Sequence, residues 1–287
     1  MKRTLVTLVL IALAYFILRL LPGYPQLPEI SYFKNSQLSV IAHRGGRGLR
    51  PGNTIEAALN AIQIGADVIE IDVHLTADGI LVVRHDDVID TTTTGSGRIS
   101  EMDITDIQLH EVGFHEFDFP DAKVLEDIRV PTLESMFKEL PDERYLIELK
   151  PNNQNTADAL CKLVTDYGLQ ESVIVGSFHS SALKYFRETC PAIPTSMGQS
   201  EMTVLVLLER LQLGHLFKSS SYSIQVPISY GGIKILSPSL VELAHKLNMR
   251  VDVWTVNDTD NMRHIIDMGV DGVITDYPDR LLSILGK

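Results

Sequence analysis

The chain has 287 residues, of which 45% are hydrophobic and 22% are charged, the composition of a globular protein long enough for one large domain or two small ones. Its 37 acidic residues outnumber its 25 lysines and arginines, which gives a net charge of −12 at pH 7 with neutral histidines. Proteins that bind a nucleic-acid backbone gain affinity from clustered cations. The acidic balance therefore argues against a nucleic-acid partner and allows only a small, local phosphate site. The sequence indicates no oligomeric state.

The N-terminal segment is strongly apolar. Lys2 and Arg3 precede residues 4–21, in which Arg19 is the only charged residue. This run is about long enough to span the hydrocarbon core of a membrane, and Arg19 can extend towards the far interface. We expect residues 1–22 to form an uncleaved transmembrane anchor.

A cleaved signal peptide is the alternative for this segment, because Ala12-Leu13-Ala14 fits a small-x-small cleavage site. Basic residues at the extreme N-terminus, and none between Arg19 and Lys34, orient the N-terminus towards the cytoplasm. The predicted location is the inner membrane, crossed once, with the rest of the chain on the periplasmic or extracytoplasmic side.

The remainder of the chain divides into a linker and one large domain. Residues 23–37 are proline-rich and polar and are predicted to link the anchor to a domain over residues 38–287. Short β-branched runs alternate there with helical patterns, which indicates a parallel sheet built from strand-helix-strand units. The nine candidate strands are 38–42, 68–73, 80–83, 145–149, 173–175, 193–196, 223–226, 251–256 and 272–275. An eight-stranded barrel needs one fewer, and we expect the run at Ser223 or the run at Ile193 to lie outside it.

Two helices and one insertion are predicted within this domain. Apolar residues recur at helical spacing from Ile55 and again from Leu240. Asn53 and Glu56 are predicted to cap the first of these helices. The interval of about residues 87–131 lacks a crossover helix and is too long for a plain loop, so an inserted segment is expected there.

Two predicted strands carry ionisable side chains on one face. Alternation along Val-Ile-Glu-Ile-Asp-Val-His places Glu70, Asp72 and His74 together, and Glu148 and Lys150 share a face near the end of another strand. The carboxyl ends of barrel strands form a common mouth, so these groups are expected to converge. Three carboxylates suit one hard divalent cation, Ca²⁺ or Mg²⁺, and would repel one another strongly without it.

Two further strand ends carry histidine. His85 closes one apolar run, and His43 with Arg44 follows another. Each alone fits a structural histidine, whereas together with a metal they suit acid-base chemistry on a phosphodiester. Arg44 and Lys150 would stabilise charge on the phosphoryl oxygens. His74 and His179 are interpreted as supporting or structural residues.

Cys161 and Cys190 are too few for a disulfide framework and lack the paired spacing of a structural zinc site. They fit either two buried apolar residues or a single disulfide formed in an oxidising compartment.

An ordered set of motifs resembles the glycerophosphodiester phosphodiesterase family. The set is His-Arg-Gly from His43, Pro-x-Asn-Thr from Pro51, Glu-x-Asp from Glu70, Leu-Thr-x-Asp-Gly from Leu75, His-Asp from His85, Glu-Leu-Lys from Glu148, Trp-Thr-Val-Asn from Trp254 and Asp-Gly-Val-x-Thr-Asp-x-Pro from Asp271.

The resemblance implies an α/β fold, a (β/α)₈ TIM barrel with an inserted segment after the third strand, and metal-dependent hydrolysis of small glycerophosphodiesters to glycerol 3-phosphate and an alcohol. It implies an acid-base pair, metal ligands and phosphate contacts. These are His43 and His85 for acid-base chemistry, Glu70, Asp72 and Glu148 for the metal, and Arg44 and Lys150 for phosphate.

Gly52 departs from the family pattern, which usually has Glu before Asn-Thr. The change could weaken a hydrogen bond near the site or alter substrate preference. Trp254 and Phe178 fit either a pocket wall or the core. Two alternative functions remain open. The predicted anchor raises a lysophospholipase D that takes lysophospholipids from the membrane, and Gly52 raises a diester-binding module without turnover.

Overall fold

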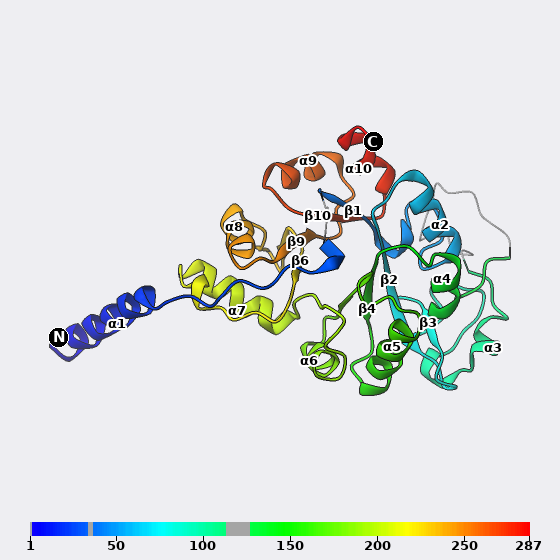
Figure 1. Cartoon of the computed structure of the whole chain (residues 1–287), viewed down its shortest axis with the longest axis horizontal. Coiled ribbons are helices and arrows are strands. Elements are labelled where there is room, and N and C mark those ends of the chain that lie inside the picture. Colours follow the sequence, from blue (N-terminus) through cyan, green and yellow to red (C-terminus); the bar gives the residue numbers. More distant parts are fainter. Residues whose placement is uncertain (1, 34–36, 113–126) are drawn as a thin grey trace.

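Seven parallel strands form a curled sheet in the order β5, β4, β2, β1, β10, β9, β6 (Figure 1). The computed structural model describes residues 2–33, 37–112 and 127–287. The parallel strands are β1 (Ser39–Ala42), β2 (Val68–Leu75), β4 (Tyr145–Leu149), β5 (Val173–Gly176), β6 (Ser223–Val226), β9 (Arg250–Val253) and β10 (Gly272–Thr275).

A short segment between β5 and β6 joins the two edges of this sheet. Thr195 makes a parallel bridge to Val175 in β5, and Ser196 makes one to Ser223 in β6. The segment from Ile193 therefore takes the eighth place of the ring, and the run from Ser223 is a regular strand of it.

The surplus candidate is instead the run at Leu81. Strand β3 (Leu81–Val83) pairs antiparallel with β2 and lies off the parallel path. The expectation that the Ser223 or the Ile193 run lies outside the barrel was therefore wrong. A short apolar run reveals burial but not the direction of its partner, and all three residues of β3 are buried.

Helices pack around the sheet (Figure 1). They are α2 (Ile55–Ile64), α4 (Leu133–Glu139), α5 (Gln154–Asp166), α6 (Ser180–Thr189), α7 (Gln199–Arg210), α8 (Pro238–Lys246), α9 (Thr259–Asp267) and α10 (Pro278–Leu285). Both predicted helices, α2 and α8, are present. The cap of α2 is Thr54, whose hydroxyl accepts a hydrogen bond from the Ala57 N–H at 3.1 Å, and not Asn53 as expected. The Asn53 amide binds Asp72 instead.

Strand β2 shows how the barrel interior is built. Ile69, Ile71 and Val73 face outward and pack against helices. Val68 faces inward and packs in a small apolar cluster with residues of other strands. Because side chains alternate, Glu70 and Asp72 face the same interior further along the strand. The barrel therefore has an apolar floor below a polar upper part.

The segment between β3 and α4 has a hydrophobic cluster of its own. Its described part contains the 3₁₀ turn η3 (Ile99–Glu101) and helix α3 (Ile104–Ile107). Ile89, Ile99 and Val130 are among the buried residues that pack there. Residues 113–126 of the predicted insertion lie outside the described residues.

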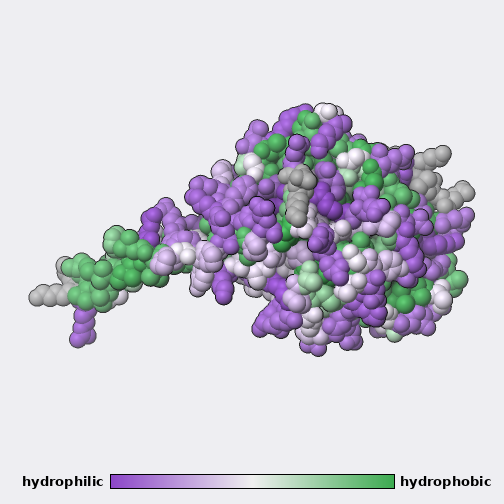
Figure 2. Space-filling model, viewed as in Figure 1, coloured by the Kyte–Doolittle hydropathy of each residue, from purple (hydrophilic) through white to green (hydrophobic). Residues whose placement is uncertain are grey.

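Helix α1 (Lys2–Leu20) projects from the body of the protein, and Figure 2 shows it as a hydrophobic rod. Within this helix, the segment Arg3–Leu20 is long and apolar enough to cross a membrane, judged by length and composition, and none of the segment is buried. Exposure throughout is not the behaviour of a core helix.

The two cysteines form a disulfide, Cys161–Cys190, which joins α5 to the end of α6.

Candidate active site

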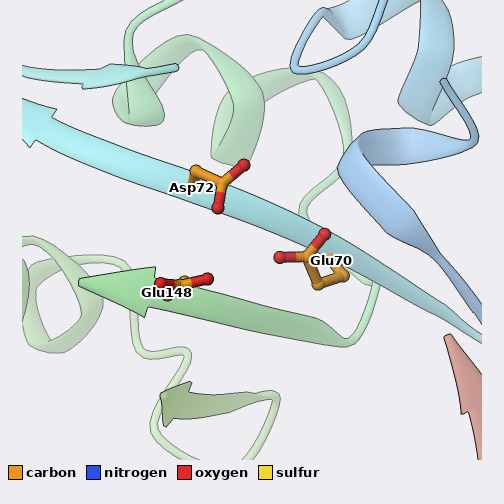
Figure 3. Close-up of side chains that lie close together, drawn as sticks. All are labelled: Glu70, Asp72 and Glu148. Atoms are coloured by element: carbon orange, nitrogen blue, oxygen red, sulfur yellow. The ribbon is translucent and has the colours of Figure 1, made fainter. Parts of the chain in front are cut away.

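Three carboxylates from β2 and β4 lie close together (Figure 3). Asp72 and Glu148 are direct neighbours in the register of the two strands, and Glu70 lies two residues earlier in β2. One oxygen from each of the three residues lies within 4.8 Å of the others. The sequence predicted this convergence, and the parallel pairing produces it.

The three carboxylates and the two basic side chains beside them change one another's pKa values. Burial raises the pKa of Glu148 to about 7, and the neighbouring Asp72 and Glu70 add to the effect. Burial and Asp72 also raise the pKa of Glu70. Burial would raise the pKa of Asp72 too, but Lys150 and Arg44 outweigh it and hold this pKa below its ordinary value. The site therefore has one firmly ionised carboxylate and two that gain from an added positive charge.

Two basic residues, Lys150 and Arg44, contact the carboxylates. The Lys150 Nζ lies 3.0 Å from Asp72 Oδ1 and 3.0 Å from Glu148 Oε2. The Arg44 backbone N–H donates to Glu70 Oε2 at 2.7 Å, and the Arg44 Nε lies 3.4 Å from Asp72 Oδ2. Arg44 has a positive φ of 51°, which orients its backbone N–H in a conformation that few non-glycine residues adopt.

His43 is held by a carboxylate that the sequence analysis did not assign. Its Nδ1 lies 2.6 Å from Asp276 Oδ1. Burial would raise the pKa of Asp276, but the hydrogen bond and charge of His43, together with Arg47 and Asn257, lower it. The ionised Asp276 can only accept, so Nδ1 carries the proton and Nε2 is left for the site. Nε2 lies 3.9 Å from Glu70 Oε2.

His85 is oriented in the same way. Its Nδ1 lies 2.7 Å from Asp86 Oδ1, and Asp86 in turn accepts a hydrogen bond from the Thr91 hydroxyl. Burial lowers the pKa of His85. His74, at the end of β2, contacts the His85 carbonyl oxygen through Nε2 at 3.0 Å. Its supporting role agrees with the interpretation from sequence.

Asn53 is a second residue that sequence reasoning missed. It has a φ of 60°, and its Nδ2 donates to Asp72 Oδ2 at 2.9 Å while its Oδ1 accepts from the Asp72 backbone N–H at 3.2 Å. Both Asn53 and Asp276 stand inside motifs that were recognised, Pro-x-Asn-Thr and the motif from Asp271. Their position inside these motifs was the signal in the sequence that could have identified them as site residues.

The site opens into a cavity of about 590 Å³. His43, Arg44, Glu70, His85, Glu148 and Lys150 all line it. Phe178 and Trp254 also line it and pack edge to face, with ring centroids 5.5 Å apart. Both aromatic residues are therefore wall residues of the pocket.

The profile of the Glycerophosphoryl diester phosphodiesterase family matches residues 43–280. The chain belongs to this family. A glycerophosphodiester phosphodiesterase of Caldanaerobacter subterraneus subsp. tengcongensis is 32% identical over 253 residues, which cover 86% of this chain and 98% of that protein.

Solved structures of glycerophosphodiester phosphodiesterases share the fold. One from Agrobacterium tumefaciens has a TM-score of 0.69 and 26% identity and covers 85% of this chain and 99% of its own. An Oleispira antarctica phosphodiesterase in complex with sn-glycerol-3-phosphate has a TM-score of 0.73 and 24% identity, with coverage of 90% and 100%.

The surroundings of Gly52 explain why glycine fits at this position. A Cβ at this position would lie 2.8 Å from the Arg47 Cβ and 3.3 Å from the Arg44 Cβ. The Arg47 Nε lies 3.2 Å from Asp276 Oδ1. A larger residue at position 52 would therefore displace the arginine that contacts the partner of His43.

Proposed function

We propose that this family member hydrolyses glycerophosphodiesters to glycerol 3-phosphate and an alcohol, with a bound divalent cation and two histidines. The observation that carries the proposal is the convergence of three carboxylates, two basic side chains and two carboxylate-held histidines at one cavity, which all of them except Asp72 line. This set contains every group required for charge stabilisation and proton transfer at phosphorus.

Both histidines direct the same ring nitrogen, Nε2, towards the proposed substrate site. Because each Nδ1 faces an aspartate, each Nε2 is available for proton transfer. One of His43 and His85 accepts the proton of the attacking hydroxyl, and the other donates to the leaving alcohol oxygen. Arg44 and Lys150 bind the phosphoryl oxygens.

The donor set fits a hard divalent cation, Ca²⁺ or Mg²⁺. Glu70, Asp72 and Glu148 offer only oxygen atoms, which is the preference of both ions. Burial raises the pKa of both Glu70 and Glu148, so a nearby positive charge would stabilise their ionised forms. When bound, the cation would supply Lewis-acid stabilisation of the phosphoryl group.

We further propose that α1 remains as a single-pass anchor in the inner membrane, with the barrel on the periplasmic or extracytoplasmic side. Lys2 and Arg3 support a cytoplasmic N-terminus. The disulfide Cys161–Cys190 supports an oxidising compartment for the barrel.

The test is the release of ethanolamine and glycerol 3-phosphate from glycerophosphoethanolamine with Ca²⁺ or Mg²⁺. We expect His43→Ala and Glu148→Ala to lose about 100-fold or more in kcat. His245→Ala is the matched control, because His245 also pairs with an aspartate, Asp271, but lies beside the opposite end of β10. Equal activity in the wild type, His43→Ala and Glu148→Ala would refute the proposed site.

A further inference from the structure

The cavity has an apolar part that hydrolysis of a small diester does not require. One face of α7 lines it, with residues at positions 199, 202, 203, 206, 207 and 210. The hairpin of β7 (Ser229–Tyr230) and β8 (Ile233–Lys234) also lines it. We call this part the α7 groove and define it by Met202, Val206, Leu207, Tyr230 and Ile233.

The walls of the α7 groove are open to solvent. Leu207 is 57% exposed, Tyr230 is 60% exposed and Ile233 is 55% exposed. Apolar side chains gathered at this exposure mark a ligand or membrane site more often than a stable protein surface. Because the same cavity contains the catalytic histidines and carboxylates, whatever occupies the groove is placed beside the phosphodiester.

The α7 groove also lies next to the membrane anchor. Helix α7 extends over about 18 Å, and the residues that follow it contact the end of α1 (Figure 1). The Tyr15 hydroxyl donates to the Leu211 carbonyl oxygen at 2.9 Å, and the Arg19 Nη1 donates to Gln212 Oε1 at 2.9 Å. Tyrosine and arginine near the end of a spanning helix lie at the lipid-water interface.

The position of the groove between α1 and the candidate active site restricts the kind of group that can fill it. With α1 as the proposed anchor, one end of the groove wall lies at the level of the lipid head groups, and the cavity that it lines contains the proposed phosphodiester site. A hydrocarbon chain attached to a glycerophosphodiester satisfies both conditions. A deacylated diester would leave the apolar walls in water.

We propose that the α7 groove binds the single acyl chain of a lysophospholipid drawn from the outer leaflet of the anchoring membrane. The inference rests on the proposed function, because the same bond is broken. Water adds across the bond between phosphorus and the alcohol oxygen. Its hydroxyl ends on phosphorus and its remaining proton on the alcohol, which gives a monoacylglycerol phosphate and the free alcohol.

The test compares substrates that release the same product. The full chain is reconstituted in nanodiscs of diacyl phosphatidylcholine and is given glycerophosphoethanolamine or lysophosphatidylethanolamine with 6, 8 or 10 acyl carbons. Released ethanolamine is measured for each. We expect kcat/KM to rise with chain length, by about tenfold for two added methylenes while they enter the groove.

Matched variants of α7 locate the effect. Leu207→Gln should lower the ratio of kcat/KM for the 10-carbon substrate to that for glycerophosphoethanolamine by about tenfold. Val204→Gln is the control, because Val204 is 49% exposed on the same helix but does not line the cavity. It should change this ratio by less than about twofold, since surface changes away from a site have small effects.

Three outcomes overturn the inference, and one of them also bears on the proposed function. Release from glycerophosphoethanolamine without a gain from acyl carbons would refute the acyl site and leave the proposed function intact. An equal fall of the ratio in Val204→Gln and Leu207→Gln would also refute it. No release from any substrate would overturn the proposed function together with this inference.

Discussion

Replacing Asp276 with asparagine should reduce activity while leaving the fold unchanged. Three side chains, those of His43, Arg47 and Asn257, present N–H groups to the Asp276 carboxylate at 2.6 Å, 3.2 Å and 2.6 Å. An asparagine amide nitrogen is itself a donor, so in either orientation it would face another donor. The hydrogen bond that holds His43 would be lost or made neutral.

The expected cost follows from the strength of that bond. A hydrogen bond to a charged group contributes about 1.5 to 3 kcal/mol, and each 1.4 kcal/mol is a factor of ten. Asp276→Asn should therefore lower kcat/KM for the preferred diester by about 10- to 100-fold. The change should appear mainly in kcat, because Asp276 acts through His43 and not by binding the substrate.

The assay is steady-state release of the alcohol by the full chain, with circular dichroism to confirm folding. The matched control is Asp271→Asn, because Asp271 makes a similar contact to a histidine, 2.8 Å from His245 Nε2, just before β10, whereas Asp276 follows that strand. Activity of Asp276→Asn within twofold of the wild type would contradict the reasoning. An equal loss in Asp271→Asn would also contradict it, since a general structural defect would then explain both.

Two further predictions concern the metal site and the disulfide. Burial raises the pKa of Glu148 to about 7, so below that pH a proton competes with the cation, and the apparent affinity for Ca²⁺ or Mg²⁺ should fall about tenfold per pH unit between pH 7 and 5. Calorimetric titration at fixed ionic strength measures this affinity, and a value independent of pH across that interval would disprove the competition. Cys161→Ser with Cys190→Ser removes a link between positions 29 residues apart and should lower the free energy of unfolding by about 3 kcal/mol. Urea unfolding of the double variant against the oxidised wild type tests this, and unchanged stability would show that the link does not constrain the unfolded chain.

The candidate metal site could be predicted from sequence because it depends on local rules. Alternation along one strand places Glu70 and Asp72 on one face whatever the rest of the chain does. The same alternation along a second strand places Glu148 and Lys150 on one face. Parallel strands end at the same edge, so convergence of the two strands followed from the fold class.

The partner of His43 illustrates what local rules do not reach. His43 and Asp276 are 233 residues apart, and they meet because β1 and β10 are neighbours in the barrel. Apolar content likewise does not reveal that the run at Leu81 pairs antiparallel while the segment at Thr195 bridges two parallel strands. Strand direction is set by partners across the sheet.

The residue pattern alone was enough to predict the apolar N-terminal helix, the alternation of strands and helices, and the ionisable residues that face the barrel interior. Each of these depends on spacing along the chain, which is fixed covalently. The folded structure is needed to show that Asp276 contacts His43, that Cys161 meets Cys190, and that one face of α7 forms an apolar wall beside the candidate site. These features depend on packing in the folded protein, which brings residues of separate strands and helices into contact.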